Sequence, residues 1–486
     1  MAALDEIRAE RLRKLKLLEE RGINPFPNRS NRTETIGSVL SGFAELEQKG
    51  TVVTIDGRVR ALRKHGGSAF LDIEDGSGRM QAFFKKDEIG EEAFTLFEEV
   101  LDMGDFIEVT GTAMRTKHGQ ESILATSWRM LAKSLRPIPD EWYGFSDEEE
   151  RFRRRYLDML INKEVLENAQ KRSVFWNAFR SYLIERGFVE VETPVLENTT
   201  GGAEARPFVT HHNALDIDVF LRISAGELWQ KMLLVGGLTR TFEIGRIFRN
   251  EGMSREHLQD YTQLEFYQAY SDYEEGMRMV QDLYRHVAKE TFGTLTFTIG
   301  EHTVDLGAEW QVYDFCEVLK REYGIDPTNT TIEEVAAALK KAGIEKEEAM
   351  NIERGVDLLW KKVRKTISGP GFLIGVPVYL EPLAKKSEKN EKVVERFQVL
   401  LAGSEMGKGF SELNNPIDQR ERFEHQQALR DTGDDEAQMA DMNFVEALEY
   451  GMPPSFGFGC SERLFSFLMN KDVREAQLFP LMRPRD

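Results

Sequence analysis

The stretch FEIGRIFRNEGMSREHLQDYTQLEFYQAY, residues 242–270, decides the fold around it. Apolar residues alternate with polar ones at both of its ends, as at Leu264 and Phe266, and this period is typical of a half-buried strand. Residues 250–260 lie between the two ends and carry glycine, serine and several charges, as a hairpin loop does. The stretch therefore predicts a long antiparallel β-hairpin.

One face of this hairpin carries side chains that a strand core does not need. The arginine fork suits a phosphate or a carboxylate, and a tyrosine ring offers a surface on which a base could stack. A solvated strand face with ordinary ion pairs would show the same residue types. The residues expected on this face or at its turn are Arg249, Glu251, His257, Tyr261, Glu265 and Tyr267.

Composition excludes several classes of protein. A chain of 486 residues with 41% hydrophobic residues predicts two or more domains. We find no apolar run long enough to span a membrane and no signal-peptide core, so we expect a cytoplasmic protein without a membrane partner. Cys316 and Cys460 are the only cysteines, which argues against a disulfide framework. The net charge of −19 argues against indiscriminate binding to DNA or RNA.

The amino-terminal region predicts a helix followed by a barrel. Residues 3–21 form a basic amphipathic pattern. Docking of its leucines on its own domain is the favoured interpretation, with RNA phosphate contact and membrane contact as alternatives. Residues 52–129 show five alternating segments and one helical segment near 91–101, a pattern that suits an OB-fold barrel. Such barrels bind single strands through aromatic and polar side chains, and Phe70 and Gln81 lie on suitable strands.

Prolines within residues 135–139 mark a boundary, so we predict domains 1–139 and 140–486. In the second domain, a helix is expected over 164–186, followed by a strand over 188–194. Adjacent histidines at 211 and 212 would point to opposite faces of a strand, which argues against a zinc site.

The last third carries two candidate anion and metal segments. Glu405 and Glu412 lie in glycine-rich residues 403–414 and could bind Mg²⁺ while the backbone passes close to a nucleotide. Arg463 follows the glycines of residues 457–459 and opens an apolar helix. A GxxxxGK loop and leucine-rich βαβ repeats are absent from the sequence, which argues against a P-loop or Rossmann site.

Together these segments resemble the class II aminoacyl-tRNA synthetases, and among them the bacterial-type lysyl enzymes. FRNEG at 248–252 with the strand 264–267 is similar to motif 2 of that family, 164–194 to motif 1 and 457–464 to motif 3. The resemblance covers nearly the whole chain. It implies an α+β fold: an amino-terminal OB barrel, then an antiparallel sheet of six or seven strands flanked by helices, with a helical insertion at about 291–368.

The resemblance also implies partners and roles. It implies a homodimer that uses L-lysine, ATP, Mg²⁺ and tRNA(Lys), with Arg249 and Arg463 as catalytic residues and Glu405 and Glu412 as metal ligands. The implied ATP-binding residues are Arg249, Glu251, His257, Tyr261, Glu405, Glu412 and Arg463. The implied lysine-binding residues are Gly202, Glu227, Arg249, Glu265, Tyr267 and Lys408. The implied anticodon-binding residues are Arg63, Phe70 and Gln81.

Three departures from the family pattern stand out. Lys408 occupies the place of an asparagine, Gln398 occupies the place of a third carboxylate, and the third motif is one residue shorter before its arginine. A cation close to a cationic substrate should repel it. We therefore expect Lys408 either to point away from the substrate or to neutralise Glu412.

The reaction that the resemblance implies is the activation of lysine with ATP, followed by transfer of lysine to the 3′ end of tRNA(Lys). Two alternatives remain open at the level of sequence. One is a synthetase for aspartate or asparagine, although Glu265 would then be misplaced because those substrates have no side-chain cation. The other is a non-catalytic paralogue that binds RNA, which retention of Arg249, Glu405 and Arg463 argues against.

Overall fold

The structure is a computed structural model that describes residues 2–139, 147–203, 205–252, 254, 256–344, 351–431 and 438–485. The chain divides into two compact units, residues 1–151 and 152–486. The domain boundary predicted between residues 139 and 140 adjoins residues 140–146, which lie outside the described residues.

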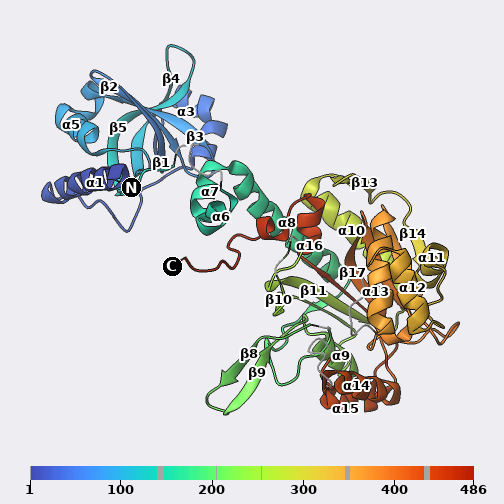
Figure 1. The fold of residues 1–486 in the computed structure, drawn as a ribbon. Coiled ribbons are helices and arrows are strands. Elements are labelled where there is room, and N and C mark those ends of the chain that lie inside the picture. Colours follow the sequence, from blue (N-terminus) through green and yellow to red (C-terminus); the bar gives the residue numbers. More distant parts are fainter. Residues whose placement is uncertain are drawn as a thin grey trace. The chain divides into compact units, whose positions relative to one another are not determined.

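The first unit is built around a closed barrel whose strands follow the order β1-β2-β3-β5-β4 (Figure 1). Burial alternates along β2 and β3, so every second side chain enters the barrel core. The OB barrel predicted from sequence is confirmed. Its elements are α1 (Ala2–Glu20), α2 (Ile36–Ser41), α3 (Phe43–Lys49), β1 (Val52–His65), β2 (Ser68–Glu74), β3 (Arg79–Lys85), α4 (Lys86–Ile89), α5 (Glu91–Val100), β4 (Phe106–Arg115) and β5 (Glu121–Ala132).

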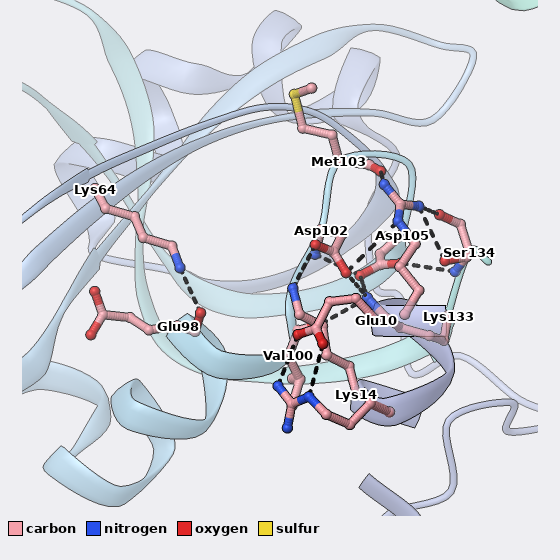
Figure 2. Close-up of polar contacts among 12 residues, drawn as sticks. Glu10, Lys14, Lys64, Glu98, Val100, Asp102, Met103, Asp105, Lys133 and Ser134 are labelled. Carbon is pink, nitrogen blue, oxygen red and sulfur yellow. Dashed lines mark hydrogen bonds and ion pairs between the residues drawn. The ribbon is translucent and has the colours of Figure 1, made fainter. Parts of the chain in front are cut away.

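Helix α1 docks on this barrel through Leu17, Leu18 and a group of ion pairs. Leu18 is fully buried. Lys14 Nζ lies 2.7 Å from Asp102 Oδ1, and Lys133 Nζ lies 2.6 Å from Asp102 Oδ2, as Figure 2 shows. The Lys133 side chain has no exposed surface, so it needs these carboxylate partners. The favoured interpretation of the basic helix, docking on its own domain, is confirmed.

The second unit contains an eight-stranded sheet in the order β14-β15-β16-β17-β18-β11-β10-β6 (Figure 1). The expectation of six or seven strands was wrong because two short strands, β6 and β14, pair in parallel at its two edges. The sheet strands are β6 (Val189–Glu190), β10 (Arg240–Phe248), β11 (Asp260–Ala269), β14 (Gln311–Asp314), β15 (Gly371–Ile374), β16 (Arg396–Leu401), β17 (Ser404–Ser411) and β18 (Ser455–Ser461).

Helices and two smaller sheets surround this sheet. The smaller sheets are β7-β9-β8 and β12-β13. Their strands are β7 (Leu196–Glu197), β8 (Val209–His212), β9 (Ile217–Leu221), β12 (Thr296–Ile299) and β13 (His302–Asp305). The remaining helices are α6 (Glu148–Arg153), α7 (Arg155–Ile161), α8 (Lys163–Glu185), α9 (Glu227–Val235), α10 (Tyr273–Phe292), α11 (Phe315–Tyr323), α12 (Ile332–Lys341), α13 (Ile352–Val363), α14 (Pro416–Asp431), α15 (Met442–Glu449), α16 (Arg463–Leu468) and α17 (Val473–Ala476).

The insertion predicted at about 291–368 is helical only from residue 315 onward. Before that point lie the end of α10, the β12–β13 hairpin and the sheet strand β14. Those strands are only four residues long. An alternating pattern of this length is too short to identify a strand from the sequence. Helices α11 and α13 contact each other, as do α12 and α13.

The predicted hairpin is β10 paired with β11, with Glu243 opposite Glu265. Its apolar residue Phe266 packs in one core cluster with Phe175 of α8 and Tyr284 of α10. Tyr267 packs in a second cluster with Leu228 of α9 and Trp360 of α13. The alternation read from sequence therefore sends neighbouring side chains of β11 into separate cores, and the polar face lies on the side of α9 and α13.

Candidate active site

Two adjoining cavities lie over the polar face of the hairpin. The first has a volume of about 740 Å³ and the second about 230 Å³. Several residues line both cavities, so the two cavities share a wall. The shared lining residues are Arg249, Gln263, Glu405, Lys408 and Gly459.

Glu265 lies in the first cavity and is held by three donors. Its Oε2 accepts a hydrogen bond of 2.9 Å from the Tyr267 hydroxyl, and its Oε1 accepts from the Gln263 amide at 2.8 Å and the Ala225 N–H at 3.1 Å. Only 3% of Glu265 is exposed. Glu265 and Tyr267 therefore lie together, as their spacing on one strand face predicts.

The same cavity holds an ion-pair cluster that sequence reasoning missed. Lys231 Nζ lies 2.8 Å from Glu227 Oε1 and 2.6 Å from Glu412 Oε2, and its side chain is 1% exposed. The spacing of Glu227 and Lys231 by four residues on α9 was the available signal, because such residues are neighbours on a helix. The contact with Glu412 joins distant segments and left no local pattern.

Negative charge predominates at this end of the cavity. Glu227, Glu265 and Glu412 are all buried, and Glu227 and Glu412 share the ammonium of Lys231. Burial, with the neighbouring Glu227 charge, raises the pKa of Glu265 to about 8. Burial also raises the pKa of Glu412 to about 8, although Lys231 opposes the shift. A ligand with ammonium groups would supply the missing counter-charges.

A glycine makes room for this cluster. Gly202 has a φ of +88°, and a Cβ placed on it would lie 2.7 Å from the Cβ of Glu227. A side chain at position 202 would therefore displace the Glu227 carboxylate. Gly202 lines the first cavity together with Glu227, where the resemblance predicts a lysine-binding residue.

The second cavity gathers the remaining residues predicted to bind ATP. The Arg249 guanidinium lies 5.9 Å from the centre of the Tyr261 ring, and the His257 Nδ1 lies 2.7 Å from the Ser254 hydroxyl. Arg463 pairs with Glu256, and burial lowers the Arg463 pKa. The predicted residues that line the second cavity are Arg249, Glu251, His257, Tyr261, Glu405 and Arg463.

The two glutamates predicted to bind metal have different surroundings. Glu405 Oε1 accepts a 2.7 Å hydrogen bond from the Trp360 indole, and its Oε2 has no hydrogen-bond partner among the described residues. Glu412 pairs instead with Lys231 and lines only the first cavity. The structure thus places Glu412 beside Lys231 and away from the other residues predicted to bind ATP, and its predicted role toward ATP and metal stays a prediction. The described residues contain no group of three His, Cys, Asp or Glu that could hold a metal ion.

Lys408 pairs with Glu381, not with Glu412. Its Nζ lies 3.2 Å from Glu381 Oε2, and Arg396 Nε lies 3.0 Å from Glu381 Oε1. Of the two outcomes expected for Lys408, neutralisation of Glu412 is not seen, because Lys231 pairs with Glu412; that Lys408 points away from the substrate stays a prediction. Lys408 nevertheless lines both cavities.

The barrel of the first unit presents the predicted anticodon residues on one face. Phe70 stacks on Phe83 with ring centres 4.3 Å apart, and Arg63 is the cross-strand partner of Phe70. The Gln81 side-chain oxygen accepts a 3.0 Å hydrogen bond from the Ser122 hydroxyl. Sequence reasoning missed Phe83, although its alternation with buried Phe84 marked it as outward-facing.

Comparison with known proteins places the chain in a family. Residues 147–483 match the family described as tRNA synthetases class II (D, K and N), and residues 53–136 match the OB-fold nucleic acid binding domain. A lysine–tRNA ligase of Roseiflexus sp. is 44% identical over 99% of this chain and 100% of its own length. The lysine–tRNA ligase of Halalkalibacterium halodurans is 42% identical over 99% of this chain and 98% of its own length. That of Bacillus subtilis is 41% identical over 97% of this chain and 96% of its own length. The chain therefore belongs to the class II tRNA synthetases of the D, K and N type, together with the bacterial lysine–tRNA ligases.

Proposed function

We propose that the chain is a lysine–tRNA ligase, which activates lysine with ATP and transfers it to the 3′ end of tRNA(Lys). The observation that carries this proposal is the set of three buried carboxyl groups that line the first cavity, Glu227, Glu265 and Glu412, of which Glu227 and Glu412 pair with the one ammonium of Lys231. Lysine brings two ammonium groups and one carboxylate, which complements this arrangement. Aspartate brings the opposite side-chain charge, and asparagine brings none.

In this proposal each charged group of lysine has its own partner. Glu265 and the Tyr267 hydroxyl bind the ε-ammonium, Glu227 binds the α-ammonium, and Arg249 binds the carboxylate. Glu412 stays with Lys231 and fixes the position of that ammonium. A buried ammonium without a carboxylate partner would be very costly, so the arrangement of carboxylates selects the substrate.

Activation then requires positioning and charge neutralisation, with no protein nucleophile. A carboxylate oxygen of lysine attacks the α-phosphorus of ATP, the bond to the bridging oxygen breaks, and pyrophosphate leaves. Arg249 lines both cavities and would contact the lysine carboxylate and the α-phosphate at once, while Arg463 neutralises the outer phosphates. A hydroxyl at the 3′ end of tRNA next attacks the acyl carbon, and AMP leaves.

The donor set fits one Mg²⁺ that arrives with ATP. Magnesium is usually held by one or two carboxylates together with substrate phosphates, and Glu405 has an oxygen available in the second cavity. Such an ion would supply positive charge to the phosphates. Glu405 is the residue of this chain that would hold it, and Trp360 would orient Glu405.

We further propose a cytoplasmic homodimer. None of the described helices is long and apolar enough to cross a membrane. Exposed apolar residues on β6 and in the region of the β7-β9-β8 sheet support a second copy as the partner, because a partner would remove them from water. The exposed residues that form it are Val189, Val195, Leu196, Val209, Leu215 and Ile217.

Pyrophosphate exchange into ATP, measured with each of the twenty amino acids, tests the function. We expect exchange with lysine alone. Faster exchange with aspartate or asparagine would favour the alternative synthetase, and no exchange with any amino acid would favour a non-catalytic RNA-binding protein.

Replacing Phe70 with alanine should weaken tRNA charging and leave lysine activation unchanged. We propose that a base of the anticodon stacks on Phe70, and the loss of one such contact costs about 1–3 kcal/mol. Phe70 is partly exposed, whereas the adjacent Leu71 is fully buried, so Leu71→Ala serves as the control that damages the barrel itself. The KM for tRNA(Lys) and the rate of pyrophosphate exchange should be measured for both variants. A fall in the rate of pyrophosphate exchange for Phe70→Ala would show that Phe70 supports the folded structure and does not act in tRNA binding alone.

Lysine binding should strengthen as the pH rises from 6 to 8. The raised pKa of Glu265, about 8, keeps this carboxyl protonated in the empty cavity below that pH. An ammonium needs the carboxylate, so binding below pH 8 must release a proton, and affinity should rise by up to about tenfold per pH unit for each proton released. Above pH 8 this dependence should level off.

Calorimetry in buffers of different ionisation enthalpy measures the proton release directly. We expect the release at pH 7 to fall in Glu265→Gln, which has one titrating carboxyl fewer. A dissociation constant that is flat between pH 6 and 8, with no proton released, would contradict the proposed ion pairs.

A further inference from the structure

We propose that Lys408 binds the polyphosphate of ATP and supplies positive charge that would otherwise come from an additional metal ion. This inference rests on the proposed function, because it assumes that the second cavity holds ATP. It concerns Lys408, which the family resemblance assigned to the amino acid.

The position of Lys408 suits a phosphate ligand. It lies on β17, and its Cα partner on the neighbouring strand β16 is Gln398. Both residues line the second cavity with Arg249 and Arg463, the two arginines proposed to contact phosphates. The Lys408 side chain is 45% exposed, so its ammonium can reach a ligand in the space that the two cavities share.

The charges around Lys408 leave an excess of positive charge. Glu381 lies between Lys408 and Arg396, at 3.2 Å and 3.0 Å, so one carboxylate serves two cations. Arg396 is 8% exposed and Glu381 6%, and this buried pair can persist without a third member. Lys408 is thus the more exposed of the two cations and the one that can turn toward an anion.

The described residues give the second cavity four carboxylates, those of Glu251, Glu256, Glu405 and Glu462. Two of them have cationic partners, because Glu256 pairs with Arg463 and Glu462 pairs with Arg172, and Gln398 is neutral. Glu405 is the carboxylate that both cavities share. This donor set suits one Mg²⁺ and leaves part of the phosphate charge to be neutralised by side chains.

Electrostatics also separates Lys408 from the lysine substrate. The buried carboxylates Glu227 and Glu412 pair with Lys231, and with Glu265 they form the proposed ammonium site. The cations Lys408 and Arg396 instead gather around Glu381. An anionic polyphosphate next to Lys408 would be attracted, whereas a substrate ammonium there would be repelled.

Equilibrium binding of ATP with and without Mg²⁺ tests the inference. Calorimetry should use the full chain, first in EDTA and then in excess Mg²⁺, with wild type, Lys408→Met and Lys408→Arg. We expect wild type to bind ATP in EDTA, and Lys408→Met to bind it at least about tenfold more weakly, as expected for the loss of a charge-assisted hydrogen bond. Excess Mg²⁺ should reduce this difference, and Lys408→Arg should bind like wild type.

Lys361→Met is the matched control. Lys361 lines the first cavity only and pairs with Asp357 at 2.7 Å, so its loss should leave ATP binding in EDTA unchanged. Unchanged lysine affinity in Lys408→Met would show that the variant is folded. Equal ATP affinity of wild type and Lys408→Met in EDTA would overturn the inference, as would failure of wild type to bind ATP without Mg²⁺. Failure of the proposed function is distinguishable, because wild type would then show no lysine-dependent pyrophosphate exchange in Mg²⁺.

Discussion

Norleucine, which has a methyl group in place of the ε-ammonium of lysine, should be activated about 10⁴–10⁵-fold less efficiently than lysine, as sites built around a polar partner reject analogues that lack it. The reason lies in Glu265, which is 3% exposed and already bonded to Tyr267. Norleucine would cover this carboxyl with a methyl group and offer it neither a charge nor a hydrogen bond. The ratio of kcat/KM in pyrophosphate exchange measures the discrimination.

Replacing Glu265 with glutamine should remove most of this discrimination. The variant keeps the shape of the site and the possibility of a bond to Tyr267, but it lacks the charge that the ε-ammonium requires. The KM for lysine should rise by about 10²-fold or more, as expected when a buried charge loses its partner, while the KM for ATP changes little. Asp357→Asn is the control, because Asp357 lines the same cavity and pairs with Lys361 instead. A KM for lysine that stays near the wild-type value would remove Glu265 from the ammonium site.

Sequence reasoning was most successful where the relevant pattern is local. The alternation around Leu264 and Phe266 predicted the hairpin, and the observed pairing of β10 with β11 follows it over nine residue pairs. Glu265 and Tyr267 follow directly from that period, because side chains two residues apart in a strand share a face. The OB barrel was predictable for the same reason.

Contacts between distant segments were not predictable in this way. Lys231 and Glu412 meet because α9 packs beside the sheet strands, and no spacing in the sequence encodes that contact. Trp360 reaches Glu405 from α13, within a segment to which the sequence assigned no chemistry. The assignment of Lys408 to the lysine-binding residues came from the resemblance alone. The resemblance does not identify Glu381 as the partner of Lys408.

The exchange of Arg249 for lysine should reduce pyrophosphate exchange by about 10²–10³-fold, the usual effect of losing one preorganised electrostatic group. Arg249 lies just beyond the end of β10 and lines both cavities. Its Nε donates to the Ile223 carbonyl at 3.2 Å, which fixes the guanidinium and leaves its terminal nitrogens for the lysine carboxylate and the α-phosphate. Lysine would keep the charge but not the planar fork that can contact two anions at once.

Because that double contact forms fully only as the new bond forms, kcat should fall more than the affinity for lysine or ATP. Arg246→Lys is the matched control. Arg246 lies on the same strand, pairs with Asp260 and does not line either cavity. Its variant should keep wild-type exchange. If Arg249→Lys also kept wild-type exchange, charge alone would be sufficient at this position. The proposal that one guanidinium contacts both substrates at once would then be wrong.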